Sequence, residues 1–192
     1  MHDSTKGNIV VVEFKSVARG IIVTDYMLKA ARVKLILGTT LCPGKYLTIA
    51  EGDVDAVNKA MDTADRFGGR HVFSSFVISG INSEVIDAIG GRTALALQDS
   101  IGIIESLQMA NLINAADISI DTAEVEFLEL RLGKGCGVNS FYIITGSITS
   151  VNEAVKSSTD FLRERGALIA YKVIANPDKD LLKYLQPSLC SC

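Results

Sequence analysis

An internal repeat constrains the fold of this chain more than any other feature of its sequence. One group of residues recurs 92 positions later: Glu13, Ala18, Asp25, Ala31 and Val33 recur as Glu105, Ala110, Asp117, Ala123 and Val125. A second group recurs after 94 positions: Gly52, Val57, Asn58 and Ala60 recur as Gly146, Val151, Asn152 and Ala154. A further shift aligns Val77-Ile78 with Val173-Ile174. Because the separation changes only at expected loops, the sequence indicates two copies of one unit of about 90 residues.

Each copy has the same order of expected elements. The first copy predicts strands at 9–14, 33–41, 46–50 and 71–79 and helices at 16–31 and 53–67. The second copy predicts strands at 101–106, 125–132, 140–145 and 168–174 and helices at 109–122 and 148–164. A short terminal helix is expected at the end of each copy, at 82–89 in the first, and residues 90–92 are expected to link the copies. The order β-α-β-β-α-β predicts an α/β (α+β) fold of the split βαβ, ferredoxin-like class, with one antiparallel sheet and helices on one face. We expect domains at 8–90 and 100–185.

Composition excludes several classes of function. The 192 residues are 48% hydrophobic with a net charge of -3, so a packed core is expected and no basic surface indicates nucleic acid. The longest apolar runs are far shorter than the roughly 20 residues that cross a bilayer, and no apolar signal core follows Met1. We therefore expect a cytoplasmic protein without a membrane partner. In that reducing compartment its four cysteines should be free or metal-bound.

Two helix motifs resemble a known family. Residues 25–33, "DYMLKAARV", resemble the D-x-M-x-K-A-A-x-V helix end of bacterial microcompartment shell proteins, and residues 52–57, "GDVDAV", resemble their G-D-V-x-A-V helix start. Two such units in tandem resemble the trimer-forming, pseudohexameric members. The loop at 42–45 together with residues 78–81 is similar to one subtype, the iron–sulfur-binding T-type of propanediol-utilisation microcompartments. The resemblance extends from residue 8 to about residue 185.

The resemblance implies a structural shell protein rather than an enzyme. It implies a homotrimer that tiles with other shell proteins around encapsulated redox enzymes, with Cys42 of three chains holding one 4Fe-4S cluster in the central pore. That cluster would transfer electrons across the shell or be exchanged for enzymes inside. Lys29 is implied to contact neighbouring tiles. Its counterpart in the second copy is Asp121, where the family usually repeats the lysine, so half of the tiling edge departs from the pattern.

The residues around Cys42 are compatible with that use. A cluster takes about four ligands, and one cysteine per chain can supply three of them only around a three-fold axis. Pro43 restricts the loop, Gly44 permits positive φ, and Lys45 would favour the thiolate. The same residues also suit an inert cysteine in an ordinary hairpin turn, or a zinc ion held by three thiolates and water. Two further alternatives stay open: a tile that gates metabolites without a cluster, and a ferredoxin-like regulatory module that binds a small ligand.

The remaining motifs point to no active site. Residues 133–137, "GKGCG", run into an expected strand rather than opening a helix, so they are not a nucleotide-binding loop. We expect Gly135, Cys136 and Gly137 to form the pore loop of the second copy. The Cys190-Ser191-Cys192 tail is expected to be a poor metal cage. We expect a structural role for His71, and expect Glu13 and Glu105, which follow equivalent strands, to anchor backbone or interface contacts.

Overall fold

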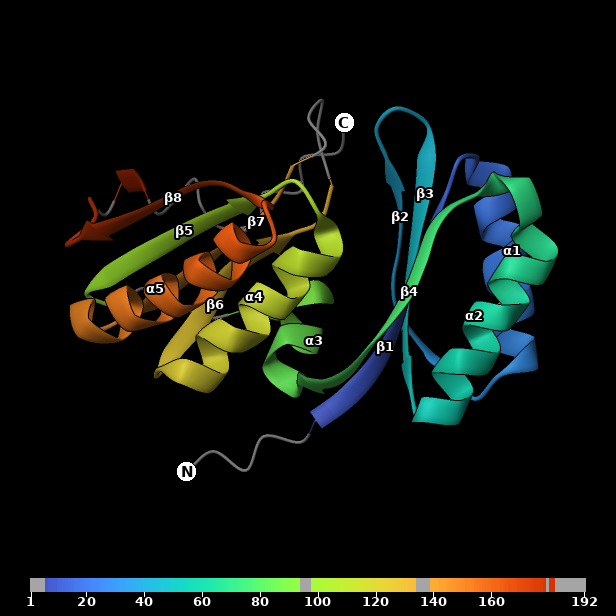
Figure 1. Ribbon diagram of the computed structural model, residues 1–192, viewed down its shortest axis with the longest axis horizontal. Helices are drawn as coiled ribbons and strands as arrows, with labels where there is room; N and C mark the ends of the chain where they lie inside the picture. Colours follow the sequence, from blue (N-terminus) through green and yellow to red (C-terminus); the bar gives the residue numbers. More distant parts are fainter. Residues whose placement is uncertain (1–5, 94–97, 134–138, 179, 182–192) are drawn as a thin grey trace. The chain divides into compact units, whose positions relative to one another are not determined.

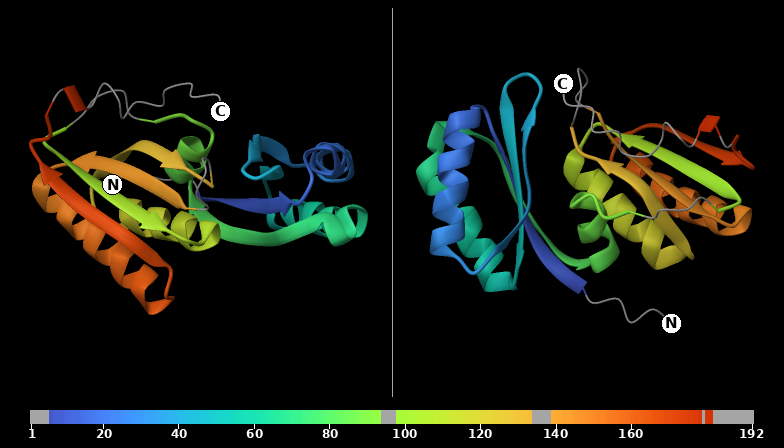
Figure 2. Two further views of the ribbon diagram at one scale, coloured as in Figure 1. Left: turned by 90° about the horizontal axis from the view of Figure 1, so that it is seen from above. Right: turned by 180° about the vertical axis from the view of Figure 1, so that it is seen from behind.

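The chain folds into two compact units, residues 1–86 and 87–192. The computed structural model describes residues 6–93, 98–133, 139–178 and 180–181. Each unit contains one four-stranded antiparallel sheet with two long helices on one of its faces (Figures 1 and 2). The fold class predicted from the sequence is therefore confirmed.

The first unit contains four strands and two long helices. Along the chain these are β1 (Lys6–Phe14), α1 (Val17–Ala30), β2 (Lys34–Leu41), β3 (Lys45–Gly52), α2 (Val54–Gly68) and β4 (Val72–Asn82). A 3-10 turn, η1 (Gly69–His71), precedes β4, and a short helix, α3 (Ser83–Ile89), follows it. The strand order is β2-β3-β1-β4, with antiparallel neighbours throughout. His71 therefore ends η1 instead of opening the last strand, because Gly69 turns the chain with a φ of 50°.

The second unit repeats this arrangement. Its elements are β5 (Ser100–Ser106), α4 (Met109–Thr122), β6 (Val125–Arg131), β7 (Ser140–Gly146), α5 (Ile148–Glu164) and β8 (Leu168–Ala175), in the sheet order β6-β7-β5-β8. The registers confirm the repeat: Val12 lies opposite Thr48 in the first sheet, and their counterparts Ile104 and Tyr142 are opposite in the second. A short terminal helix was expected in this copy too, and most of that segment lies outside the described residues.

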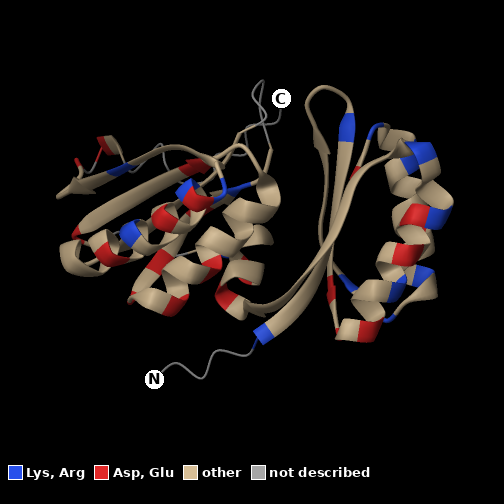
Figure 3. Cartoon of the chain, in the orientation of Figure 1, with Lys and Arg blue, Asp and Glu red and all other residues tan. Residues whose placement is uncertain are grey.

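The core of the first unit lies between its sheet and its helices. It is built from buried side chains of β1, α1 and α2, including Val10, Val12, Phe14, Val23, Met27, Val57 and Ala64. α2 starts at Val54 because the Asp53 side chain accepts a hydrogen bond of 2.8 Å from the N–H of Ala56, which caps the helix. On their outer faces α2 and α5 each carry charges of both signs (Figure 3). Within the described residues, no helix is long and apolar enough to span a membrane.

In each unit a buried polar pair joins the first helix to the same position of the neighbouring strand, and the helix residue lies about one turn later in the second unit than in the first. In the first unit the hydroxyls of Thr24 on α1 and Thr48 on β3 are 2.6 Å apart. In the second unit the pair is Ser119 on α4 and Tyr142 on β7, with their oxygens 2.7 Å apart. Because each hydroxyl has a partner, neither pair leaves an unsatisfied polar atom in the core.

Candidate functional site

The β2–β3 hairpin presents Cys42 to solvent. β2 ends at Leu41, which is buried and lies opposite Lys45 in the ladder, and the exposed residues Cys42, Pro43 and Gly44 form the turn between them. The Cys42–Pro43 peptide is cis, and Gly44 has a φ of 75°, in the region that favours glycine. The hairpin projects beyond the ends of β1 and β4 (Figure 1). The sulfur therefore lies at the outer end of a two-stranded projection with a buried base.

Three side chains hold the base of this hairpin. The Lys45 ammonium lies 3.2 Å from Oε2 of Glu13 at the end of β1, and 3.3 Å from the ring centroid of Phe73 on β4. The side chains of Lys45 and Glu13 are only 18% and 13% exposed. The sequence predicted that the positive charge of Lys45 would favour the thiolate of Cys42, and the structure pairs that charge with a carboxylate. Glu13 thereby anchors the hairpin to the neighbouring strand.

The described part of one chain offers Cys42 alone as a thiol ligand. Within residues 6–93, 98–133, 139–178 and 180–181, no group of three or more His, Cys, Asp or Glu side chains gathers to hold a metal. A metal centre at Cys42 with three or more such ligands would therefore draw some of them from outside this part of the chain. An exposed sulfur on a projecting turn suits a site shared between copies, because it is open to solvent.

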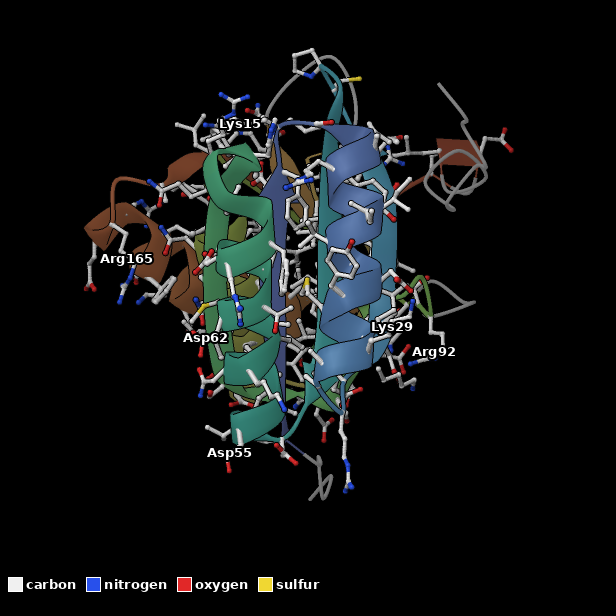
Figure 4. The ribbon with its side chains drawn as sticks, turned by 90° about the vertical axis from the view of Figure 1, so that its right-hand side faces the viewer. Lys15, Lys29, Asp55, Asp62, Arg92 and Arg165 are labelled. Atoms are coloured by element: carbon white, nitrogen blue, oxygen red, sulfur yellow. The ribbon has the colours of Figure 1, made fainter. Side chains whose placement is uncertain are left out.

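The other candidate residues fall into two groups. Gly135, Cys136 and Gly137 of the second loop, and Cys190 and Cys192 of the tail, lie outside the described residues, so their roles stay predictions. Lys29 lies in the last turn of α1 on the outer side of the helix layer (Figure 4) and is 73% exposed. Its ammonium lies 2.6 Å from Oδ2 of Asp25, one turn earlier.

Comparison with known proteins identifies the family. The family model of the BMC domain matches the chain twice, at residues 9–81 and 100–177. The chain belongs to the BMC-domain family of bacterial microcompartment shell proteins. It is 31% identical over 175 residues to the bacterial microcompartment shell protein PduT of Citrobacter freundii, covering 91% of this chain and 95% of PduT.

Solved structures agree with this assignment. The crystal structure of a microcompartment protein from Desulfitobacterium hafniense DCB superposes on this chain with a TM-score of 0.88 and 37% sequence identity. The match covers 93% of this chain and 99% of that protein's chain. The fused permuted hexameric shell protein MSM0275 is 19% identical with a TM-score of 0.56, and that likeness concerns the fold alone. These relatives are structural proteins and not enzymes. The sequence-based prediction of a tandem-domain protein of the microcompartment shell is therefore confirmed.

Proposed function

We propose that this shell protein assembles as a homotrimer in which Cys42 of three chains binds one 4Fe-4S cluster on the symmetry axis. The observation that carries the proposal is the exposed Cys42 sulfur on a projecting turn of an anchored hairpin. The 31% identity with the shell protein PduT over nearly the whole of both chains supports the part of the proposal that concerns the shell. When bound, such a cluster supplies one-electron redox chemistry at the centre of the tile.

Each part of the hairpin has a role in this proposal. Cys42 would provide one thiolate per chain, so three chains around a three-fold axis would hold the cluster by three thiolates, and water or a small exogenous molecule would supply the remaining ligand. Gly44 adds no side chain to a turn that three copies would bring close together. Leu41 and the Glu13–Lys45 pair fix the base of the hairpin, which limits where the sulfur can lie. The cluster would carry electrons between the two sides of the shell or be passed to enzymes inside.

Purification under argon tests this function. The wild-type protein, as isolated or after reconstitution with iron and sulfide, should be a brown trimer with a broad visible band and, once reduced, an electron paramagnetic resonance signal. Cys42→Ser should remain a trimer and lose both signals, whereas Cys136→Ser should keep them. A colourless wild-type trimer after reconstitution would overturn the proposal. Zinc found in place of iron would indicate a metal site without redox function. If neither wild type nor Cys42→Ser held metal and their shells were equally permeable to metabolites, the result would favour a tile that gates metabolites without a cluster.

A further inference from the structure

The ion pair at the base of the hairpin lies on the face of the first sheet that is turned away from its helices. Val12 and Phe14 pack into the core beneath α1 and α2, so Glu13 between them projects from the opposite face. There its Oε2 atom meets the Lys45 ammonium at 3.2 Å, and the Phe73 ring covers that ammonium at 3.3 Å. Because both charged side chains are mostly buried, solvent and salt screen this pair less than a surface pair.

The second copy keeps the carboxylate without its cation. Glu105 is the counterpart of Glu13, since both lie opposite equivalent residues of the neighbouring strands, Leu47 for Glu13 and Phe141 for Glu105. By the same registers the counterparts of Lys45 and Phe73 are Asn139 and Ile169. The charge pair therefore occurs in the copy that carries Cys42 and not at the equivalent place in the other.

Lys45 is close enough to Cys42 to affect it electrostatically. They are three positions apart in sequence, so their Cα atoms are at most about 11 Å apart. In a trimer, three Lys45 ammonium groups would surround three thiolates and a cluster whose negative charge grows on reduction. Uncompensated, those ammonium groups would favour the reduced cluster and raise its reduction potential. Glu13 opposes this effect because its carboxylate is in direct contact with the ammonium.

We propose that Glu13 is a tuning residue for the loop: by pairing with Lys45 it keeps the surroundings of Cys42 electrically balanced and holds the reduction potential of the cluster down. This inference rests on the proposed function of Cys42. Glu13 acts through Lys45 and is not a ligand.

A redox titration of four variants tests the sign of the effect. Followed by electron paramagnetic resonance, Glu13→Gln should shift the midpoint potential upward, because Lys45 is left uncompensated. Lys45→Met should shift it downward, because Glu13 is left uncompensated. The double variant Glu13→Gln/Lys45→Met should return close to wild type. Glu105→Gln is the matched control in the second copy and should leave the potential unchanged.

A second measurement reads the local charge in the protein without a cluster. The ratio of alkylation rates of Cys42 by anionic iodoacetate and by neutral iodoacetamide, followed on the Cys42 peptide by mass spectrometry, reports local potential independently of the thiolate fraction. The ratio should rise several-fold in Glu13→Gln, fall in Lys45→Met, and stay at the wild-type value in the double variant and in Glu105→Gln.

The outcomes separate this inference from the function on which it rests. One outcome would overturn the tuning role and leave cluster binding intact. In it, Glu13→Gln and Lys45→Met still form trimers, but neither the midpoint potential nor the alkylation rate ratio differs from wild type. A wild-type protein that binds no cluster but shows the expected rate ratios would overturn the proposed function and support the electrostatic role of Glu13. Shifts of the same sign in both single variants would point to disruption of the hairpin and contradict charge balance.

Discussion

Tyr142 shows most clearly how one position of the shared fold is filled by different residues in the two units. It is fully buried at the position that Thr48 occupies in the first unit, and its hydroxyl bonds to Ser119 at 2.7 Å and donates to the carbonyl of Ala115 at 3.2 Å. Burial disfavours the phenolate and raises the pKa of Tyr142 from 10.0 to about 12, an effect that the Ser119 hydrogen bond only partly offsets. The neutral form is therefore the one the folded protein requires.

This shift predicts an alkaline loss of stability. The pKa of Tyr142 is higher in the folded state than in the unfolded state. Its neutral form therefore contributes to the free energy of unfolding in full below pH 10, and this contribution is lost as pH rises toward 12. The loss amounts to about 3 kcal/mol. Tyr142→Phe should cost about 1 kcal/mol at pH 7, through the lost hydrogen bonds, and should lose this part of the alkaline slope. Urea unfolding at a series of pH values measures both. Tyr171→Phe, at a side chain 42% exposed, is the control. Identical slopes for wild type and Tyr142→Phe would contradict the account.

At the scale of elements, the contact between the first helix and the third strand is filled in opposite ways in the two units. In the first unit Gly20 on α1 faces Tyr46 on β3 so closely that a Cβ on Gly20 would lie 2.7 Å from the Tyr46 Cβ. The equivalent positions in the second unit hold Leu112 and Ser140, both buried. The first unit thus pairs a small helix residue with a large strand residue, and the second unit pairs a large helix residue with a small strand residue. The packed volume at this contact is therefore similar in the two units.

This exchange predicts coupling between the two positions. Gly20→Leu should destabilise the protein by about 3 kcal/mol through overpacking, and Tyr46→Ser by about 2 kcal/mol through lost packing. The double variant should cost at least about 1 kcal/mol less than the sum of the two, because the smaller strand residue makes room for leucine. Denaturant unfolding of the four proteins gives the coupling energy. Additive losses would show that the helix and strand do not share this space.

The sequence predicted the elements well because apolar periodicity and duplication both report local structure. Among the described residues it placed every long helix and every strand, and the outline of the Cys42 hairpin. It did not predict that β1 begins at Lys6 and that β4 continues to Asn82, because most residues at these ends are polar or glycine and the ends are held by pairing with each other beyond a bulge. It also did not predict the Glu13–Lys45 contact, because its partners are 32 residues apart and meet only when β1 and β3 pair.

At the scale of the whole molecule, duplication places two copies of the unit in each chain, so a three-fold ring would present six units around its edge. Lys29 provides a test of that edge. Its pair with Asp25 is exposed and contributes at most about 0.5 kcal/mol, so Lys29→Ala should fold and form trimers normally.

The expected defect of Lys29→Ala lies in assembly. Electron microscopy and sedimentation of sheets should show a several-fold loss of extended assemblies relative to wild type, at unchanged trimer content. Lys156→Ala in α5 is a matched control, since Lys156 is 80% exposed and also pairs with an aspartate one turn away, Asp160. Equal loss in the two variants would contradict a specific role for Lys29.

Native mass spectrometry of the anaerobically prepared protein tests the central claim most directly, because it counts chains and metal in the same particle. The convergence of three Cys42 side chains predicts a trimer that carries the mass of one cluster, about four iron atoms per three chains, and a Cys42→Ser trimer that carries none. Metal bound chain by chain, or a reconstituted trimer of bare polypeptide mass, would contradict it.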